Sequence, residues 1–410
     1  MVQLSFTLLP AILLALRVTA GPVLVNESPI TLDISRRFNF AGGSVVQSDL
    51  ARINALKNRS TMNNGLNARD VISETVVNRA FNYIATVGVG SPATSYDLII
   101  DTGSSVTWIG AGKNYVVTST STQTSSSVSV SYGSGNFSGT EYTDQVTLAP
   151  GLVIPEQSIG VASSSSGFDE GIDGILGLGP VGLTAGSLSP DSESLIPTVM
   201  DNLVSQGTII NNIFGISFLP ATIEDDTNGS IAFGGIDRTR FTGEIAYTPV
   251  TSTSPASGYW GIDQEVTYGT TSILASTAGI VDTGSTLIHL ATDGFNRYKS
   301  ATGGVLDATT GLLTITATQY AALHNLNFII GGVTYALTPN AQIWPRSLNT
   351  AINGTASSIY LVVIDSGSSS GKGLDFINGY AFLERFYSVH DMDNNRIGFA
   401  TTPFTRLHTN

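Results

Sequence analysis

The 410-residue sequence contains no cysteine, and only 12% of its residues are charged. Without cysteine no disulfide bond can form, so the hydrophobic core alone must stabilise the fold. A hydrophobic content of 41% over this length is enough for one large or two medium domains. The apolar runs are short and lie among many Gly, Ser and Thr residues, which favours short strands and turns over long helices.

Motifs for metals and cofactors are also lacking. The four histidines are scattered without the spacing of metal ligands. The stretch DMDNNRIG (391–398) begins like a calcium-binding loop, but Arg396 stands where that loop requires glycine. We therefore expect no metal and no cofactor.

Basic residues are scarce relative to acidic ones: 18 Lys and Arg stand against 31 Asp and Glu, and the net charge is −13. A chain this acidic has little with which to bind nucleic acid. The charge is uneven, because residues 1–70 carry seven basic and four acidic residues whereas the remainder carries eleven and twenty-seven. A basic leader before an acidic body suggests a detachable segment held by charge attraction.

The one long hydrophobic run covers residues 4–16 and is too short to span a membrane, and small residues (VTA, 18–20) follow it at a typical signal-peptidase site. No later run is long enough to span a membrane, and none is expected to bind one. We predict a secreted protein, with the vacuole as the alternative destination. Three glycosylation sequons fit this route, at Asn136, Asn228 and Asn353. The predicted regions are a signal peptide (1–20), a propeptide (21–69), an N-terminal lobe (70–237) and a C-terminal lobe (238–410).

Two segments show helical features. SDLARINALKNR (48–59) lies in the predicted propeptide, and the polar stretch after it is typical of an exposed linker that is cleaved near Arg69. SLIPTVMDNLVSQG (194–207) carries an apolar stripe at helical spacing, with Ser194 as the expected N-cap and Gly207 as the end.

A coarse internal repeat runs through the body. Residues 81–109 and 258–290 each open with aromatic residues and a strand, pass a turn, and enter an Asp-Thr-Gly-Ser loop from a second strand. Two copies of one supersecondary unit imply two similar lobes. A site at the junction of the lobes could then contain one loop from each.

The two loops place Asp101 and Asp282 between apolar segments. A single Asp-Thr-Gly is usually a turn, but two copies flanked in this way indicate two buried carboxylates, and burying one without a partner is costly. The least costly arrangement brings the two together so that they share one proton. Such a pair can act as general base on a water molecule and as general acid on a carbonyl oxygen.

Five stretches carry a resemblance to a known family: DTGSSVTW (101–108), VSYGSG (130–135), DGILGLG (173–179), VDTGSTLI (281–288) and FLERFYSVHDMDNNRIGFA (382–400). From about residue 70 to 410 the chain resembles the pepsin-like aspartic proteases, and within them the cysteine-free fungal members. The resemblance implies an all-β, bilobal pepsin-like fold, in which two related β-rich lobes with a few short helices flank a central cleft.

The resemblance also assigns roles to residues. Asp101 and Asp282 would be the catalytic pair, Thr102 and Thr283 would brace the two loops, and Ser104 and Ser285 would orient the carboxylates. The hairpin 127–142 would be a flap over the cleft, with Tyr132 at its tip and Trp108 as the partner of its hydroxyl. Without the resemblance, Tyr132 would be a half-buried strand residue. The predicted substrate-binding residues are Gly103, Trp108, Tyr132, Gly133, Ser134, Gly284 and Thr286.

Two positions depart from the family pattern. Asn378 stands where an aliphatic residue is usual, which questions the local packing. His390 stands where an aromatic residue is common, and we expect it to be structural.

The implied activity is that of an aspartic endopeptidase made as a zymogen, which hydrolyses peptide bonds at acid pH and prefers apolar or aromatic residues around the cut. Two alternatives stay open: an inactive pepsin-fold binding or inhibitor protein, and a glycoside hydrolase that uses two carboxylates. The expected partners of a monomeric protein are polypeptide substrates and its own propeptide, with Lys57 or Arg59 on the aspartate pair.

Overall fold

The computed structural model describes residues 29–38, 44–62, 81–133, 135–220 and 226–410. The predicted signal peptide and the predicted cleavage site at Arg69 lie outside these ranges. Among the helices it describes, none combines the length and apolar character needed to cross a lipid bilayer.

The described chain is rich in strands, as predicted. The strands are β1 (Ile30–Phe38), β2 (Phe81–Val89), β3 (Thr94–Asp101), β4 (Trp108–Ile109), β5 (Thr122–Tyr132), β6 (Gly135–Ala149), β7 (Leu152–Ser166), β8 (Gly174–Gly177), β9 (Leu188–Ser189), β10 (Ile213–Phe218), β11 (Asp226–Phe233), β12 (Thr242–Pro249), β13 (Gly261–Tyr268), β14 (Thr271–Val281), β15 (Ile288–Leu290), β16 (Val305–Leu306), β17 (Leu313–Ile315), β18 (Leu326–Ile330), β19 (Val333–Leu337), β20 (Ile359–Tyr360), β21 (Val363–Asp365), β22 (Phe376–Asn378), β23 (Phe386–Asp391) and β24 (Arg396–Thr401). The α-helices are α1 (Val45–Met62), α2 (Val199–Ser205), α3 (Thr292–Thr302), α4 (Ala317–Ala321) and α5 (Tyr380–Leu383). Short 3₁₀ helices cover Val181–Thr184, Ala256–Gly258, Pro339–Gln342 and Arg346–Ile352.

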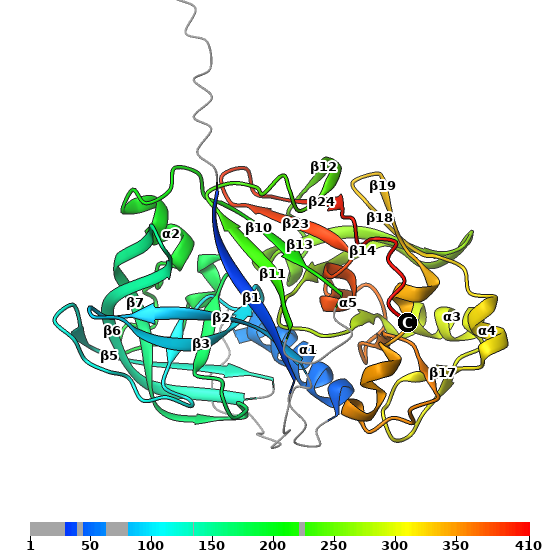
Figure 1. Cartoon of the computed structure of the whole chain (residues 1–410), viewed down its shortest axis with the longest axis horizontal. Coiled ribbons are helices and arrows are strands. Elements are labelled where there is room, and N and C mark those ends of the chain that lie inside the picture. Colours follow the sequence, from blue (N-terminus) through cyan, green and yellow to red (C-terminus); the bar gives the residue numbers. More distant parts are fainter. Residues whose placement is uncertain (1–28, 39–43, 63–80, 134, 221–225) are drawn as a thin grey trace, which may run out of the picture.

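Most strands belong to two sheets. The larger sheet has the order β12-β24-β23-β10-β11-β1-β2-β3-β8-β4-β7-β6-β5-β9, and the second has the order β19-β18-β13-β14-β22-β15-β21. In Figure 1, β5 to β7 and α2 lie on one side, α3, α4 and β17 lie on the other, and the strands around β10, β11 and β23 join the two sides. The first described strand, β1, and the last two, β23 and β24, thus all belong to the connecting part of the larger sheet.

The predicted internal repeat is present in three dimensions. In the first half β2 pairs antiparallel with β3, β3 pairs in parallel with β8, and β8 pairs antiparallel with β4. In the second half β13, β14, β22 and β15 repeat these three pairings in the same order. Each Asp-Thr-Gly-Ser loop therefore connects two strands that are held by a third strand between them.

The leader is integrated into the fold through β1 and α1. Strand β1 lies between β11 and β2 and pairs antiparallel with both. Its buried side chains alternate (Leu32, Ile34 and Arg36), as expected for a strand with one face on the core. Helix α1 covers the predicted helical stretch 48–59 and extends beyond both its ends, and Figure 1 shows it beneath β1, between the two sides of the molecule.

The second predicted helix is shorter than the sequence pattern suggested. Helix α2 begins after Thr198, whose side chain accepts from the N–H of Asp201 while the Asp201 carboxylate accepts from the N–H of Thr198. Ser194 instead donates its hydroxyl to Asp191 and is not the cap. Pro197 explains the difference, because proline has no N–H and disfavours helical geometry in the residue before it.

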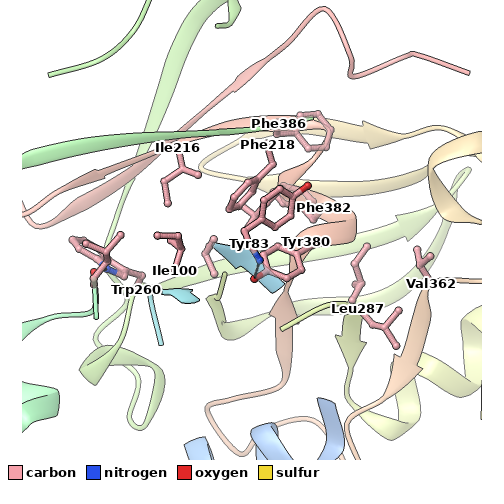
Figure 2. Close-up of a cluster of buried hydrophobic side chains, with 14 of the residues drawn as sticks. Tyr83, Ile100, Ile216, Phe218, Trp260, Leu287, Val362, Tyr380, Phe382 and Phe386 are labelled. Carbon is pink, nitrogen blue, oxygen red and sulfur yellow. Dashed lines mark hydrogen bonds between the residues drawn. The ribbon is translucent and has the colours of Figure 1, made fainter. Parts of the chain in front are cut away.

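The apolar core is continuous across the two sides. Figure 2 shows Tyr83 of β2, Phe218 of β10 and Tyr380 of α5 gathered in it. The ring of Tyr83 lies 4.0 Å from that of Phe218 and 4.7 Å from that of Tyr380, measured between centroids. Aromatic packing thus ties the first strand of the body to its last helix.

Asn378 is accommodated by a partner of matching chemistry. Its side-chain amide donates to Gln264 Oε1 at 2.8 Å, and the Gln264 amide donates back to Asn378 Oδ1 at 3.3 Å. Both residues are buried. This reciprocal pair satisfies the polar groups where an aliphatic residue was expected, so the packing is preserved.

His390 is structural, as expected. Its fully buried ring stacks on Phe214 with centroids 4.6 Å apart and meets the edge of Trp260 at 4.8 Å. Burial among these rings lowers the pKa of His390 to about 3. The side chain is therefore neutral in the folded protein over most of the acid range.

This burial predicts a contribution to acid instability. Below a pH of about 6.5 an unfolded chain protonates this histidine whereas the folded protein does not, so wild-type stability falls as the pH decreases toward 3. His390→Phe should remove up to about 1.4 kcal/mol per pH unit from that slope. Denaturant unfolding between pH 6.5 and 3 measures it. The exposed-residue control His408→Phe should keep the wild-type slope, and equal slopes for all three proteins would contradict the prediction.

Candidate active site

Asp101 and Asp282 lie at equivalent positions in the two halves. Asp101 ends β3 and aligns with Gly177 of β8. Asp282 follows β14, and its N–H donates to the carbonyl of Asn378 in β22 at 3.2 Å. Neither side chain is exposed. The apolar strands thus deliver both carboxylates to the buried junction of the two sides.

The two loops are braced to each other by their threonines. Thr102 N–H donates to Thr283 Oγ1 at 2.9 Å, and Thr283 N–H donates to Thr102 Oγ1 at 3.0 Å. Each hydroxyl in turn donates to a carbonyl of the opposite strand, that of Ile100 at 3.0 Å and that of Val281 at 3.4 Å. The relative position of the two aspartates is therefore fixed by buried backbone contacts.

Each carboxylate also has a matching pair of local donors. Ser104 donates its hydroxyl to Asp101 Oδ2 and Ser285 donates to Asp282 Oδ2, both at 2.6 Å. The N–H of Gly103 donates to Asp101 Oδ1 at 2.9 Å, and the N–H of Gly284 donates to Asp282 Oδ1 at 3.0 Å. These donors hold the carboxylates in one orientation.

A guanidinium from the leader lies on this pair. Arg52 Nη2 donates to Asp101 Oδ1 at 2.5 Å and to Asp282 Oδ1 at 2.7 Å, and its Nε donates to Asp282 Oδ2 at 2.6 Å. Because both Oδ1 atoms accept from the same nitrogen, they are no farther apart than the sum of the first two distances. This is less than the separation of about 6.5 Å or more between the two catalytic carboxyl groups of inverting glycosidases. Burial alone would lower the pKa of Arg52, but the charges of both aspartates raise it well above its ordinary value.

The expectation that Lys57 or Arg59 would occupy the aspartate pair is wrong. Lys57 donates to the Ser366 carbonyl and the Ser368 hydroxyl, and Arg59 donates to the Ser131 carbonyl. Helix geometry provides the reason for Lys57, because this residue lies five positions after Arg52. It is therefore about 7.5 Å farther along the helix axis and points in a different direction, toward Ser366 and Ser368. The planar fork of arginine also suits two carboxylates better than the point charge of lysine.

The missed residues had a signal in the sequence. Asp49, Arg52, Ile53 and Leu56 follow helical i, i+3, i+4, i+7 spacing, and all four are buried in the structure. Ile53 and Leu56 pack against an apolar cluster that includes Tyr259. Charged residues inside an otherwise apolar stripe mark side chains that need buried partners. Lys57 lies off this stripe, whereas Arg59 lies on the same face as Arg52 but about 10.5 Å farther along the helix axis, where it is only partly buried.

The glycines of both loops make room for the leader. A Cβ atom on Gly103 or Gly284 would overlap the Arg52 guanidinium. The same open space could admit any other backbone or side chain to the carboxylates.

The flap hairpin consists of β5 and β6, and it contacts the leader. Tyr132 ends β5 and is buried, and a Cβ on Gly133 would overlap the backbone of Ala51 in α1. The Trp108 and Tyr132 rings lie 6.5 Å apart, and neither Trp108 Nε1 nor the Tyr132 hydroxyl has a hydrogen-bond partner among the described residues. Burial raises the pKa of the Tyr132 hydroxyl and its contact with Trp108 opposes that rise, so the two side chains interact as expected, although their spacing falls short of a regular hydrogen bond. Ser134 lies outside the described residues.

Thr286 also contacts the leader. Its N–H donates to both oxygens of Asp49 at 3.1 Å. Every described residue predicted to bind substrate in the two loops therefore lies against or next to α1.

The comparisons with known proteins agree with this geometry. The family model described as eukaryotic aspartyl protease matches residues 82–402. Polyporopepsin from Irpex lacteus is 63% identical over 334 residues, which cover 81% of this chain and 98% of that protein. Gastricsin from Cavia porcellus is 30% identical over 338 residues, or 78% of this chain and 80% of that protein.

A solved structure shows the same fold. The crystal structure of aspartic proteinase from Irpex lacteus superposes with a TM-score of 0.79 at 64% sequence identity, and the match covers 80% of this chain and 96% of that chain. The chain belongs to the eukaryotic aspartyl protease family. It is an aspartic endopeptidase with the bilobal pepsin-like fold, as the sequence predicted. This membership excludes the two alternative functions, a glycoside hydrolase and an inactive binding protein.

The threonine brace leads to a prediction about stability. Thr283→Val keeps the shape of the side chain but leaves the buried N–H of Thr102 without an acceptor, which should cost about 1–3 kcal/mol of the free energy of unfolding. Thr283→Ser keeps the hydroxyl and loses only a methyl group, so it should be closer to wild type. Denaturant unfolding compares the two. Greater destabilisation by serine than by valine would show that packing, and not the hydrogen bond, sustains the brace.

Proposed function

We propose that this aspartic endopeptidase is made as a secreted zymogen whose leader blocks the catalytic pair Asp101 and Asp282 until it is removed in acid. The observation that carries the proposal is the Arg52 guanidinium, which donates to both carboxylates. With Arg52 there, the position of an attacking water is filled. The match to the family model starts at residue 82, so β1 and α1 lie before the matched part.

The reaction follows from the pair once Arg52 has left. Two carboxylates at this separation cannot readily both ionise, so they hold one proton between them. The ionised member takes a proton from a bound water, and the protonated member donates to the carbonyl oxygen of the peptide bond. Ser104 and Ser285 fix the orientation of the carboxylates, and the flap with Tyr132 closes over the substrate and excludes water.

Acid releases the leader by removing the negative charges that hold it. Below a pH of about 4 carboxylates generally take up protons. The contacts of Arg52 with the aspartates then weaken, as does the attraction between the basic leader and the acidic body. The mature enzyme begins near Asp70, after cleavage of the polar linker, and acts as a monomer.

The preference for apolar or aromatic residues is supported by an apolar cluster that joins the flap to the strands beneath it. Val130 and Tyr132 of the flap pack in this cluster with Ile99, Trp108 and Ile175. Apolar side chains of an extended substrate can bury against such a cluster.

Acid treatment tests the proposed function directly. The full-length protein should be inactive at pH 7 and should convert at pH 3–4 to a shorter protein that digests a denatured protein substrate, with pepstatin as inhibitor. Asp101→Asn should fold but neither convert nor digest, because the amide cannot act as the base. Intact-mass spectrometry and peptide release measure both steps. Activity of Asp101→Asn equal to wild type would refute the assignment of the pair.

The contacts of the leader predict which cation maintains latency. Arg52→Gln leaves two buried carboxylates without their cation, so the leader should bind more weakly and the precursor should convert at least about tenfold faster at pH 5. Lys57→Gln and Arg59→Gln are matched controls, since the described hydrogen bonds of those side chains go to serine oxygens and not to the aspartate pair, and they should convert at rates closer to wild type.

Conversion is followed by gel electrophoresis, and the melting temperature shows whether each precursor is folded. If Arg52→Gln yields too little folded precursor, Arg52→Lys provides the second variant. It keeps the charge but loses the fork, so its rate should lie between those of wild type and Arg52→Gln. Faster conversion of Lys57→Gln than of both Arg52 variants would contradict the proposal.

A further inference from the structure

The leader places a second charged side chain in the cleft, three residues before Arg52. Asp49 Oδ2 accepts from the N–H of Leu287 at 2.7 Å, and both its oxygens accept from the N–H of Thr286 at 3.1 Å. His289 Nε2 lies 3.1 Å from Asp49 Oδ2. Asp49 is 3% exposed and His289 is 0% exposed, so the carboxylate is bound in a closed site. The peptide hydrolysis described above uses none of these contacts.

We propose that Thr286, Leu287 and His289 form a carboxylate-binding subsite of the mature protease, which recognises an Asp or Glu side chain of the substrate and which Asp49 fills in the precursor. The proposal rests on the proposed function, because the site becomes free only when the leader is removed. It adds an acidic preference at one substrate position to the apolar preference at the cut.

The donors of this subsite are held by the body and not by the leader. The N–H of Tyr380 donates to the Ser285 carbonyl at 2.9 Å, and the N–H of Ala381 donates to the Thr286 carbonyl at 3.1 Å, which fixes the peptide groups whose N–H bonds point at Asp49. His289 lies in β15, which pairs with β21 on one side and β22 on the other. These contacts do not involve α1, so the site remains in place after the leader leaves.

The subsite needs an acceptor once Asp49 is gone. Among the described residues, Asp49 provides the only hydrogen bonds to the N–H groups of Thr286 and Leu287 and to His289 Nε2. Buried donors without acceptors are costly, so water or a substrate group must replace the carboxylate. Two converging N–H groups and an imidazole suit a carboxylate best, because it offers two acceptor oxygens and a negative charge.

The charges around the subsite and its distance from the aspartate pair indicate where in the substrate an acidic residue would be recognised. Arg52 on the same helix face offsets the charge of Asp49 in the precursor, whereas in the mature enzyme the aspartate pair repels an incoming carboxylate. His289 is then the side chain that can favour it. Asp49 lies about 4.5 Å from Arg52 along the helix axis, and an extended peptide advances about 3.3 Å per residue, so the recognised position lies within about three residues of the cut.

A peptide series tests the subsite. Acid-matured enzyme is given peptides with one apolar pair at the cut and with Asp or Asn at each of the three positions outside that pair on either side, at a pH of about 5, where a peptide aspartate is ionised. We expect kcat/KM for Asp to exceed that for Asn about tenfold at one position, and to be equal or lower elsewhere. The ratio within one preparation does not depend on how much of the enzyme is folded.

Variants of His289 assign the preference to this residue. His289→Leu should bring the Asp/Asn ratio at the selected position to about one, and His289→Gln, which keeps an N–H donor on a differently shaped side chain, should leave an intermediate ratio. The matched control His324→Gln changes an exposed histidine outside the cleft and should keep the wild-type ratio.

The outcomes separate this inference from the proposed function. A wild-type enzyme that cleaves the Asn series but shows no Asp preference at any of the six positions overturns the subsite alone, and so does a preference that His289→Leu retains. An acid-treated protein that cleaves none of the peptides overturns the proposed function and the subsite with it.

Discussion

The contact of one leader guanidinium with two buried aspartates is the interaction on which the other features of the cleft depend. Three charged groups lie in a site that is almost free of solvent, and removing them from water costs several kcal/mol each. The site offsets this cost with hydrogen bonds from Arg52 to both carboxylates and with further donors from Ser104 and Ser285. The glycines of both loops are required by the same contact, because any side chain there would displace the guanidinium.

Buried ion pairs add specific contacts to the general charge attraction between the leader and the body. Arg52 meets the aspartate pair, Asp49 meets two N–H groups and His289, and Arg36 of β1 meets Glu384 at 3.0 Å. The Tyr83 hydroxyl also donates to Glu384 at 2.9 Å. Each contact satisfies a buried polar group of the body, so these leader residues and the body pack as one folded unit.

The departures from the family pattern show how local chemistry preserves a common fold. Asn378 would be an unsatisfied polar group in β22, but Gln264 of β13 provides the complementary amide. His390 replaces an aromatic residue and keeps the aromatic stacking, while its buried ring remains neutral in acid. Asn378 therefore preserves the strand contacts next to Asp282. His390 lowers the free energy of unfolding only at a pH at which the unfolded chain protonates this histidine.

The sequence by itself determined the family, the strand-rich fold, the two equivalent loops and the hairpin over them, because each depends on short motifs whose spacing is preserved along the chain. It also predicted that a basic leader binds the acidic body. Only the tertiary structure decided which leader residue meets the aspartates, since Arg52, Lys57 and Arg59 all lie on one helix and differ in their position along its axis and in the direction each side chain takes. The start of α2 and the contacts of Asp49 were decided in the same way, by a proline that prevents an earlier helix start and by donors more than 230 residues away in the chain. Sequence patterns record residue types and spacing, whereas the orientation of a helix in a cleft depends on packing against segments distant in sequence.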